Sequence, residues 1–281
     1  MNSIEFAISP CPNDTFIFYG WKAGKVKSDW KLSLQMADIE ELNRSALSKK
    51  APFIKASIAL IPEIFKDYTL LPVGCALGYG CGPKVISKCP INPSDLQDKT
   101  VLIPGKNTTA HSLFKTLFPE CTKKIFCSYD EIFEKLNKGE ADCGVIIHES
   151  RFTFQASHFI ELADLGELWT SKTELPIPLG GFFAKRSLPK EIIEGVIHTL
   201  RLSLNYSWKF PEEALNFMLS YSQEKDSEVI MQHVNLYVTQ ETYTLSPVGL
   251  KAIESLINFS YHQFYYEKVC NEEAPSLCPI L

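Results

Sequence analysis

The sequence predicts an α/β protein of two lobes with a ligand cleft between them, and three observations predict it. The chain has 281 residues, which is long for one compact core and comfortable for two. Its first half alternates short apolar runs with helical patterns, as parallel α/β units do. Residues 80–88 and 176–185 share a pattern of glycine or proline, an apolar run and a terminal lysine, which indicates paired crossings between the lobes.

Short apolar runs predict four strands in the first 90 residues. They cover residues 4–9, 32–37, 53–60 and 70–77. After the first, a loop offers Asn13 or Asp14 as the cap of a helix that begins near Thr15. After the second, Asp38 starts a helix whose apolar residues recur at helical spacing, with Glu40 near its positive end.

A glycine-rich stretch and a proline-rich joint lead into a second α/β series. Its expected strands cover residues 101–104, 124–129, 142–148 and 158–165, and its expected helices cover 108–118 and 130–138. The C-terminal remainder has apolar residues at helical spacing over 192–200, 212–221, 226–238 and 247–266. We therefore expect a middle lobe of residues 90–175 inserted into a first lobe of residues 1–89 and 176–281. This is the type II periplasmic-binding-protein-like topology.

Composition and charge exclude several classes of function. The net charge of −5 and the pI of about 5.8 give no electrostatic footprint for nucleic acid. No segment reaches the ~18 consecutive apolar residues of a membrane span, and residues 1–6 show no basic stretch followed by a long apolar run, so no secretory signal is expected. The nine scattered cysteines form no Cys-x-x-Cys pair and are interpreted as reduced thiols. A cytoplasmic protein with no nucleic-acid or membrane partner is expected.

Four loops are predicted to meet at the ligand cleft, because ligands of open parallel sheets bind beyond the carboxyl ends of the strands. These loops lie at residues 10–15, 55–60, 106–110 and 148–152. His148 is the strongest catalytic candidate in these loops. It follows a buried strand, which places its imidazole at the edge of the cleft, and an ordinary histidine pKa near ~6.5 suits a general base. The alternative is a histidine that only bonds a loop. Glu149 and Arg151 either orient it or are solvated.

The remaining candidates are binding residues. Thr108, Thr109 and Ala110 open a helix whose N-terminus offers a carboxylate seat, or else Thr108 is a plain cap. Lys55 and Ser57 share one face of a strand, where Lys55 is either solvated or a ligand group, and Asn13 and Asp14 in the first loop are further substrate-binding candidates. The six histidines show no metal-ligand spacing and the glycine run lacks a dinucleotide fingerprint, so neither a metal nor a cofactor is expected.

Several segments resemble the 1,4-dihydroxy-6-naphthoate synthase family of the futalosine route to menaquinone. They are residues 9–18, which read Ser-Pro-Cys-Pro-Asn-Asp-Thr-Phe-Ile-Phe, and residues 76–83, 104–110, 148–154, 175–180 and 237–245. The first segment and the His-Glu-Ser-Arg-Phe motif at 148–152 are specific, and the resemblance covers most of the chain. It implies a lyase without metal that converts cyclic dehypoxanthinyl futalosine into 1,4-dihydroxy-6-naphthoate and dihydroxyacetone.

The resemblance also implies roles for individual residues. His148 falls on the family's proton acceptor, and Lys55, Ala56, Ser57, Thr109 and Ala110 fall on its substrate-contacting positions. Three positions depart from the family pattern, namely Ala56, Asn107 in place of the usual histidine, and Thr239 in place of asparagine. These departures concern substrate contacts more than the type of reaction.

Two other functions fit the same fold, because fold alone does not separate an enzyme from a binding protein. One is chorismate dehydratase of the same pathway, which also takes a carboxylated small molecule. The other is a non-catalytic cytoplasmic binding protein for such a molecule. Turnover of the futalosine substrate, of chorismate, or of neither would separate the three functions. The sequence does not set the oligomeric state.

Overall fold

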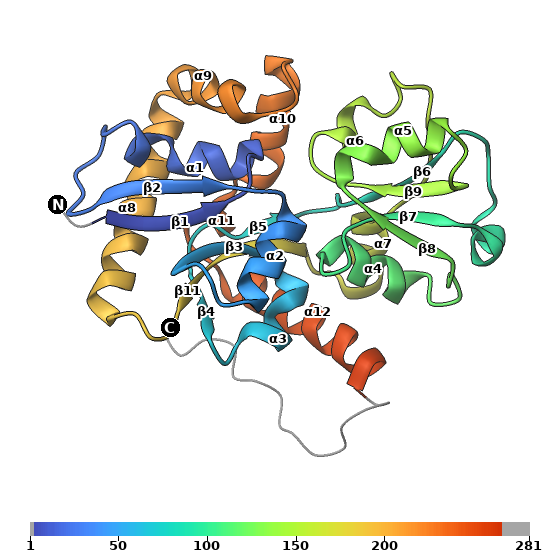
Figure 1. Cartoon of the computed structure of the whole chain (residues 1–281), viewed down its shortest axis with the longest axis horizontal. Coiled ribbons are helices and arrows are strands. Elements are labelled where there is room, and N and C mark those ends of the chain that lie inside the picture. The colour runs from blue at the N-terminus through green and yellow to red at the C-terminus, as the bar shows by residue number, and fades with distance from the viewer. Residues whose placement is uncertain (1–2, 266–281) are drawn as a thin grey trace.

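The computed structural model describes residues 3–265 as two β-sheets covered by helices (Figure 1). The strands are β1 Ser3–Ile8, β2 Lys31–Met36, β3 Phe53–Ser57, β4 Tyr68–Leu70, β5 Ala76–Gly78, β6 Lys84–Ser87, β7 Val101–Pro104, β8 Lys124–Cys127, β9 Cys143–Ile146, β10 Ile160–Asp164 and β11 Ile177–Lys185. The helices are α1 Pro12–Lys22, α2 Ile39–Leu47, α3 Ile61–Ile64, α4 Thr109–Leu117, α5 Ile132–Asn137, α6 Ser150–Thr153, α7 Leu165–Thr173, α8 Lys190–Lys209, α9 Pro211–Tyr221, α10 Ser227–Tyr237, α11 Gln240–Tyr243 and α12 Pro247–Tyr265. The predicted α/β class is confirmed.

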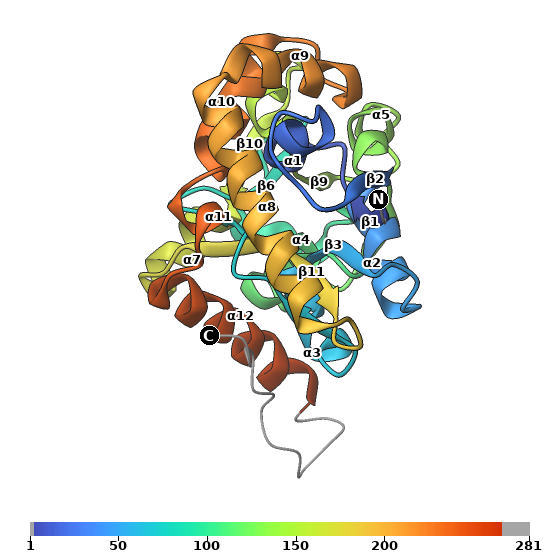
Figure 2. The same ribbon diagram turned by 90° about the vertical axis from the view of Figure 1, so that its left-hand side faces the viewer.

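The first sheet has the strand order β2-β1-β3-β11-β4, and β5 also pairs with β11. Successive side chains of a strand point to opposite faces, so each strand serves two cores. Phe6, Phe53 and Phe182 pack on the face covered by α1, α8, α9 and α10. Their neighbours Ala7, Ile54 and Phe183 pack on the face covered by α2, α3 and α12. Figure 2 shows α8 running along the first face.

The second sheet has the strand order β10-β6-β9-β7-β8. β7 is parallel to β8 and β9, whereas β6 is antiparallel to β9 and β10. On one face Val101 and Val145 pack with residues of α4 and α7, and on the other Leu102 and Ile146 pack with residues of α5. Helices on both faces explain why the inner strands β7 and β9 of this sheet are buried along their whole length.

Two chain segments connect the sheets side by side. The outgoing segment lies between β5 and β6, and the returning segment lies between α7 and β11, where Ile177 pairs with Gly78. β6 therefore belongs to the second sheet, and the change of sheet falls before Lys84 rather than after residue 89 as expected. Gly82 allows the outgoing segment to lie close to the start of α7, because a Cβ there would be 2.7 Å from the Gly166 nitrogen. The division of the chain into two lobes stays a prediction.

Three sequence predictions about local structure were wrong. The first helix begins at Pro12 with Cys11 as its N-cap, so neither Asn13 nor Asp14 caps it, because proline is well suited to the first helical position. The expected strand over 53–60 ends at Ser57 and continues as a 3-10 turn over Ile58–Leu60. The expected strand over 70–77 is two short strands, β4 and β5, with a loop between them. Among the described residues no helix has the length and apolarity to cross a membrane.

Candidate active site

A cavity of about 700 Å³ that is open to solvent lies between the two sheets. Residues of the first sheet and loops that follow strands of the second sheet line it. Eight of the nine predicted site residues line it, namely Asn13, Asp14, Lys55, Ser57, Thr108, Thr109, Ala110 and His148. The four loops expected to converge therefore do contribute to one cavity. Ala56 does not line it, because the alternation along β3 turns its side chain into the apolar core. The roles of these residues toward a substrate stay predictions.

Lys55 and Asp14 form an ion pair at the floor of the cavity. The Lys55 Nζ donates to Asp14 Oδ1 at 2.7 Å, and the side chains are 5% and 0% exposed. Asp14 also accepts from the Ser9 hydroxyl at 2.6 Å and from Asn13 Nδ2 at 2.9 Å. The Lys55 Nζ lies 4.8 Å from the centre of the Phe182 ring. Lys55 is thus a buried, paired cation, and the solvated lysine that the sequence allowed is excluded.

His148 stands between β9 and α6 in a left-handed conformation, with φ of 56°. Positive φ is uncommon for residues other than glycine and occurs where the surroundings fix the backbone. The imidazole Nδ1 lies 3.1 Å from Cys11 Sγ, and the ring packs edge-on against Tyr129 at 4.8 Å between centroids. The ring therefore has a fixed place in the cavity wall, anchored through Nδ1.

His233 on α10 is a site residue that sequence reasoning missed. Its Nε2 lies 3.2 Å from Cys11 Sγ and 3.2 Å from Asn13 Oδ1, and the residue lines the cavity. Burial lowers the pKa of the imidazole well below its usual value, and the neighbouring His148 lowers it further. No motif marked this lone histidine on a C-terminal helix, which lies 222 positions from Cys11.

The hydroxyl groups at the start of α4 are used within the protein. The Thr108 hydroxyl accepts from the His111 N–H and donates to the Gly105 carbonyl, as an N-cap does. The Thr109 hydroxyl donates to the Leu179 carbonyl at 2.7 Å. Thr108 is therefore the N-cap of α4, and whether this helix end also binds a carboxylate stays a prediction. What this helix end offers a ligand is its backbone N–H groups and their partial positive charge.

Asn107, the departure from the family pattern, takes part in a clasp between α2 and the loop before α4. Glu40 accepts from the Asn107 backbone N–H at 2.9 Å and from its Nδ2 at 2.8 Å. Asn43 donates to the Asn107 carbonyl at 2.9 Å and to Ser57 Oγ at 3.0 Å. This clasp joins α2, which packs on the first sheet, to a loop of the second sheet beside the cavity, and we expect it to favour closure of that cavity.

Glu40→Gln is expected to raise KM about tenfold and to change kcat less. The glutamine amide group must face one of the two Asn107 donors, which removes a charge-assisted hydrogen bond of ~1.5–3 kcal/mol from the closed state. Steady-state kinetics and small-angle scattering measure the effect, with a larger radius of gyration expected for the variant. Glu41→Gln, one residue along on the exposed face, is the control. Unchanged KM and radius of gyration would contradict a role of the clasp in closure.

Arg151 and Glu149 are tied to other groups than the His148 ring. The Arg151 guanidinium donates to the Gly82 carbonyl at 2.6 Å and to Asp164 at 3.2 Å, and its third contact is the Tyr237 hydroxyl. Arg151 thereby links the segment between β5 and β6 to the N-cap of α7 and to α10, and its side chain also lines the cavity. Glu149 accepts from the Ser222 hydroxyl at 3.1 Å.

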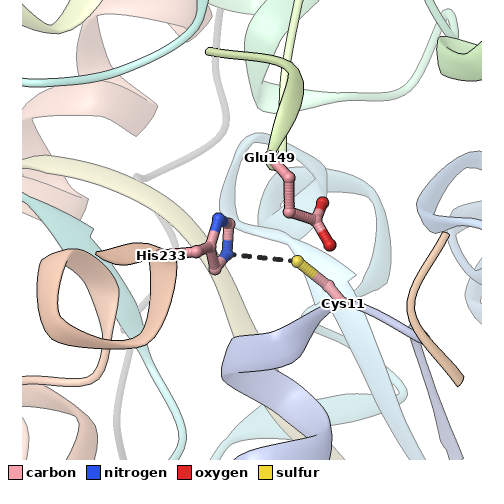
Figure 3. A group of neighbouring side chains, drawn as sticks. All are labelled: Cys11, Glu149 and His233. Carbon is pink, nitrogen blue, oxygen red and sulfur yellow. Dashed lines mark hydrogen bonds between the residues drawn. The ribbon is translucent and has the colours of Figure 1, made fainter. Parts of the chain in front are cut away.

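Three side chains of the described residues come close enough to hold a metal ion, namely Cys11, Glu149 and His233 (Figure 3). Their ligand atoms lie within 4.8 Å of one another. Metal binding needs a thiolate and an unprotonated ring nitrogen. Burial, Glu149 and Asp14 raise the pKa of the Cys11 thiol well above its usual value, and Asn13 Oδ1 accepts at His233 Nε2. The donor set therefore suits hydrogen bonding better than metal coordination.

The chain is similar to known proteins in both sequence and fold. Two curated relatives, both called 1,4-dihydroxy-6-naphtoate synthase, are similar to the chain. The protein of Thermus thermophilus is 38% identical over 91% of this chain and 93% of its own, and that of Streptomyces coelicolor is 36% identical over 91% and 92%.

Solved structures confirm the fold. A protein of Archaeoglobus fulgidus superposes with a TM-score of 0.89 at 28% identity, over 93% of this chain and 97% of its own. The alkanesulfonate-binding protein of Xanthomonas axonopodis pv. citri, solved with MOPS, superposes with a TM-score of 0.69 at 12% identity, over 97% and 95%. The expected periplasmic-binding-protein-like architecture is thus correct. A family model described as menaquinone biosynthesis matches residues 4–262, and the chain belongs to this menaquinone biosynthesis family.

Proposed function

We propose that the chain is a 1,4-dihydroxy-6-naphthoate synthase, a carbon–carbon lyase that converts cyclic dehypoxanthinyl futalosine into the naphthoate and dihydroxyacetone. The names of two relatives above 35% identity support this activity. The observation that carries the chemistry is His148, whose imidazole lines a cavity walled by both sheets. The proposed location is the cytoplasm.

The proposed mechanism uses only groups of this chain. The substrate carboxylate lies at the N-terminus of α4, next to Ser57, where backbone N–H groups and the helix dipole favour an anion. His148 accepts a proton from the substrate, and a retro-aldol-like step breaks the carbon–carbon bond and expels the three-carbon piece. The new ring becomes aromatic, which provides the driving force. Closure of the cavity fixes the reacting groups and removes water.

Incubation of the purified protein with cyclic dehypoxanthinyl futalosine tests this proposal. Mass spectrometry should show 1,4-dihydroxy-6-naphthoate and dihydroxyacetone forming in equal amounts. Chorismate, offered in parallel, should remain intact; its dehydration would show the sister activity instead. A substrate that binds tightly but stays chemically unchanged would show that the protein is a binding module.

A further inference from the structure

We propose that Cys11 and His233 are positioning residues for His148, which hold its imidazole through Nδ1 and leave Nε2 for the substrate. This inference rests on the proposed role of His148 as the base. It arises from a chain of hydrogen bonds that begins at the buried ion pair and ends at the imidazole. Because Lys55 can only donate and the Asp14 carboxylate can only accept, the hydrogen atoms can be assigned from the ion pair as far as His233.

The first links fix the amide of Asn13. The Asp14 carboxylate, paired with Lys55, can only accept, so the group of Asn13 that faces Asp14 at 2.9 Å is its NH₂. The amide oxygen of Asn13 therefore points the other way, toward Nε2 of His233 at 3.2 Å. An amide oxygen also can only accept, which requires the hydrogen atom of His233 to be on Nε2.

The next link fixes the sulfur of Cys11. His233 is buried and neutral, with its hydrogen on Nε2, and Nδ1 has no partner among the described residues, as suits a nitrogen without hydrogen. The Nε2 atom also lies 3.2 Å from Cys11 Sγ, so its single hydrogen is shared between the Asn13 oxygen and the sulfur. His233 thus holds the sulfur from one side, and Nδ1 of His148 approaches from the other at 3.1 Å.

The last link, between Cys11 Sγ and His148 Nδ1 at 3.1 Å, is compatible with either tautomer of His148, and the proposal takes the one with hydrogen on Nδ1. When Nδ1 carries the hydrogen and donates to the sulfur, Nε2 keeps the lone pair that accepts the substrate proton. In this form the thiol hydrogen points away from Nδ1, and the Glu149 carboxylate, within 4.8 Å of the sulfur but beyond hydrogen-bond distance, is the nearby charge that would attract it (Figure 3). On proton transfer both ring nitrogens carry hydrogen, and the Nδ1–H remains bonded to the sulfur. The proton returns from Nε2 when the product forms.

This arrangement explains why the segment Cys11-Pro12-Asn13-Asp14 is packed against α10. Three of its four side chains belong to the chain of hydrogen bonds, and Pro12 starts the helix that orients them. A thiol differs from the carboxylate that often holds a catalytic histidine, because it orients the ring without a permanent negative charge.

Two matched pairs of variants test the inference. Cys11→Ala and His233→Phe remove one link each, whereas Cys11→Ser and His233→Gln keep a hydrogen-bonding group at nearly the same place. We expect the first two to lower kcat about ten- to a hundredfold with KM unchanged, and the second two to recover most of the loss. Cys89→Ala, at an exposed thiol, is the control. Thermal unfolding confirms that each variant is folded.

A measurement on the resting protein separates this inference from the proposed function. Nitrogen-15 NMR of His148 should show hydrogen on Nδ1 in the wild type and a shift toward the Nε2–H form in Cys11→Ala. If Cys11→Ala changes neither the tautomer nor kcat, the positioning role is overturned, even with His148→Asn inactive. If the tautomer changes and kcat does not, positioning stands and the role of His148 as base fails.

Discussion

His148→Asn is expected to lower kcat with the futalosine substrate by about 10²–10⁴-fold, the usual contribution of a positioned general base. Asparagine suits this position for two reasons. It tolerates the left-handed backbone that His148 adopts at φ of 56°. Its amide also reaches the place of Nδ1, so that a contact with Cys11 survives while Nε2 is lost. The variant therefore removes the base with little effect on the fold.

Steady-state kinetics and the melting temperature measure this change together. His198→Asn, at an exposed position of α8, is the matched control and should match the wild type in both. We expect substrate affinity, measured by calorimetry, to stay within a few-fold, because the α4 terminus and Ser57 are intact. A folded His148→Asn protein with wild-type turnover would rule out His148 as the base.

The sequence predicted the architecture well because the spacing of the apolar residues and the length of each apolar segment distinguish strands from helices. Alternating apolar runs and helical spacing depend on local burial, and each sheet here has helices on both faces, which makes that signal strong. The strand over Val101–Pro104 agreed with its prediction residue for residue. The predicted boundary between the two sheets was misplaced, because tertiary contacts decide to which sheet a strand belongs. The apolar run of β6 fits either sheet, and only its pairing with β9 assigns it to the second.

The site was predictable to the extent that a strand end or a motif marked it. His148 and Lys55 lie in loops or strands that the topology brings together, whereas His233 comes from a helix with no motif of its own. Its role depends on contacts with Cys11 and Asn13, more than 200 positions away, which no spacing rule predicts. Sequence likewise could not show that Lys55 is neutralised by Asp14 in the cavity floor.

Asp14→Asn is expected to lower the free energy of unfolding by about 3–5 kcal/mol, because it leaves the Lys55 ammonium buried without its counter-charge. The Asp14 side chain is fully buried and accepts from Lys55, Asn13 and Ser9. An amide group in its place must direct a donor at one of them. Urea unfolding followed by circular dichroism measures the change, and Glu134→Gln, in an exposed pair on α5, is the control with no measurable loss.

The matching variant Lys55→Met separates two roles that the lysine could have. If the ammonium mainly neutralises Asp14, Lys55→Met destabilises the protein as Asp14→Asn does, and the double variant recovers much of the loss because neither charge is left alone. If the ammonium instead serves mainly to bind the substrate, stability is unchanged and KM alone rises. The 2.7 Å contact and the burial of both side chains favour the first outcome. A stable Lys55→Met protein would therefore contradict the structural role of the pair and restore Lys55 as a substrate ligand.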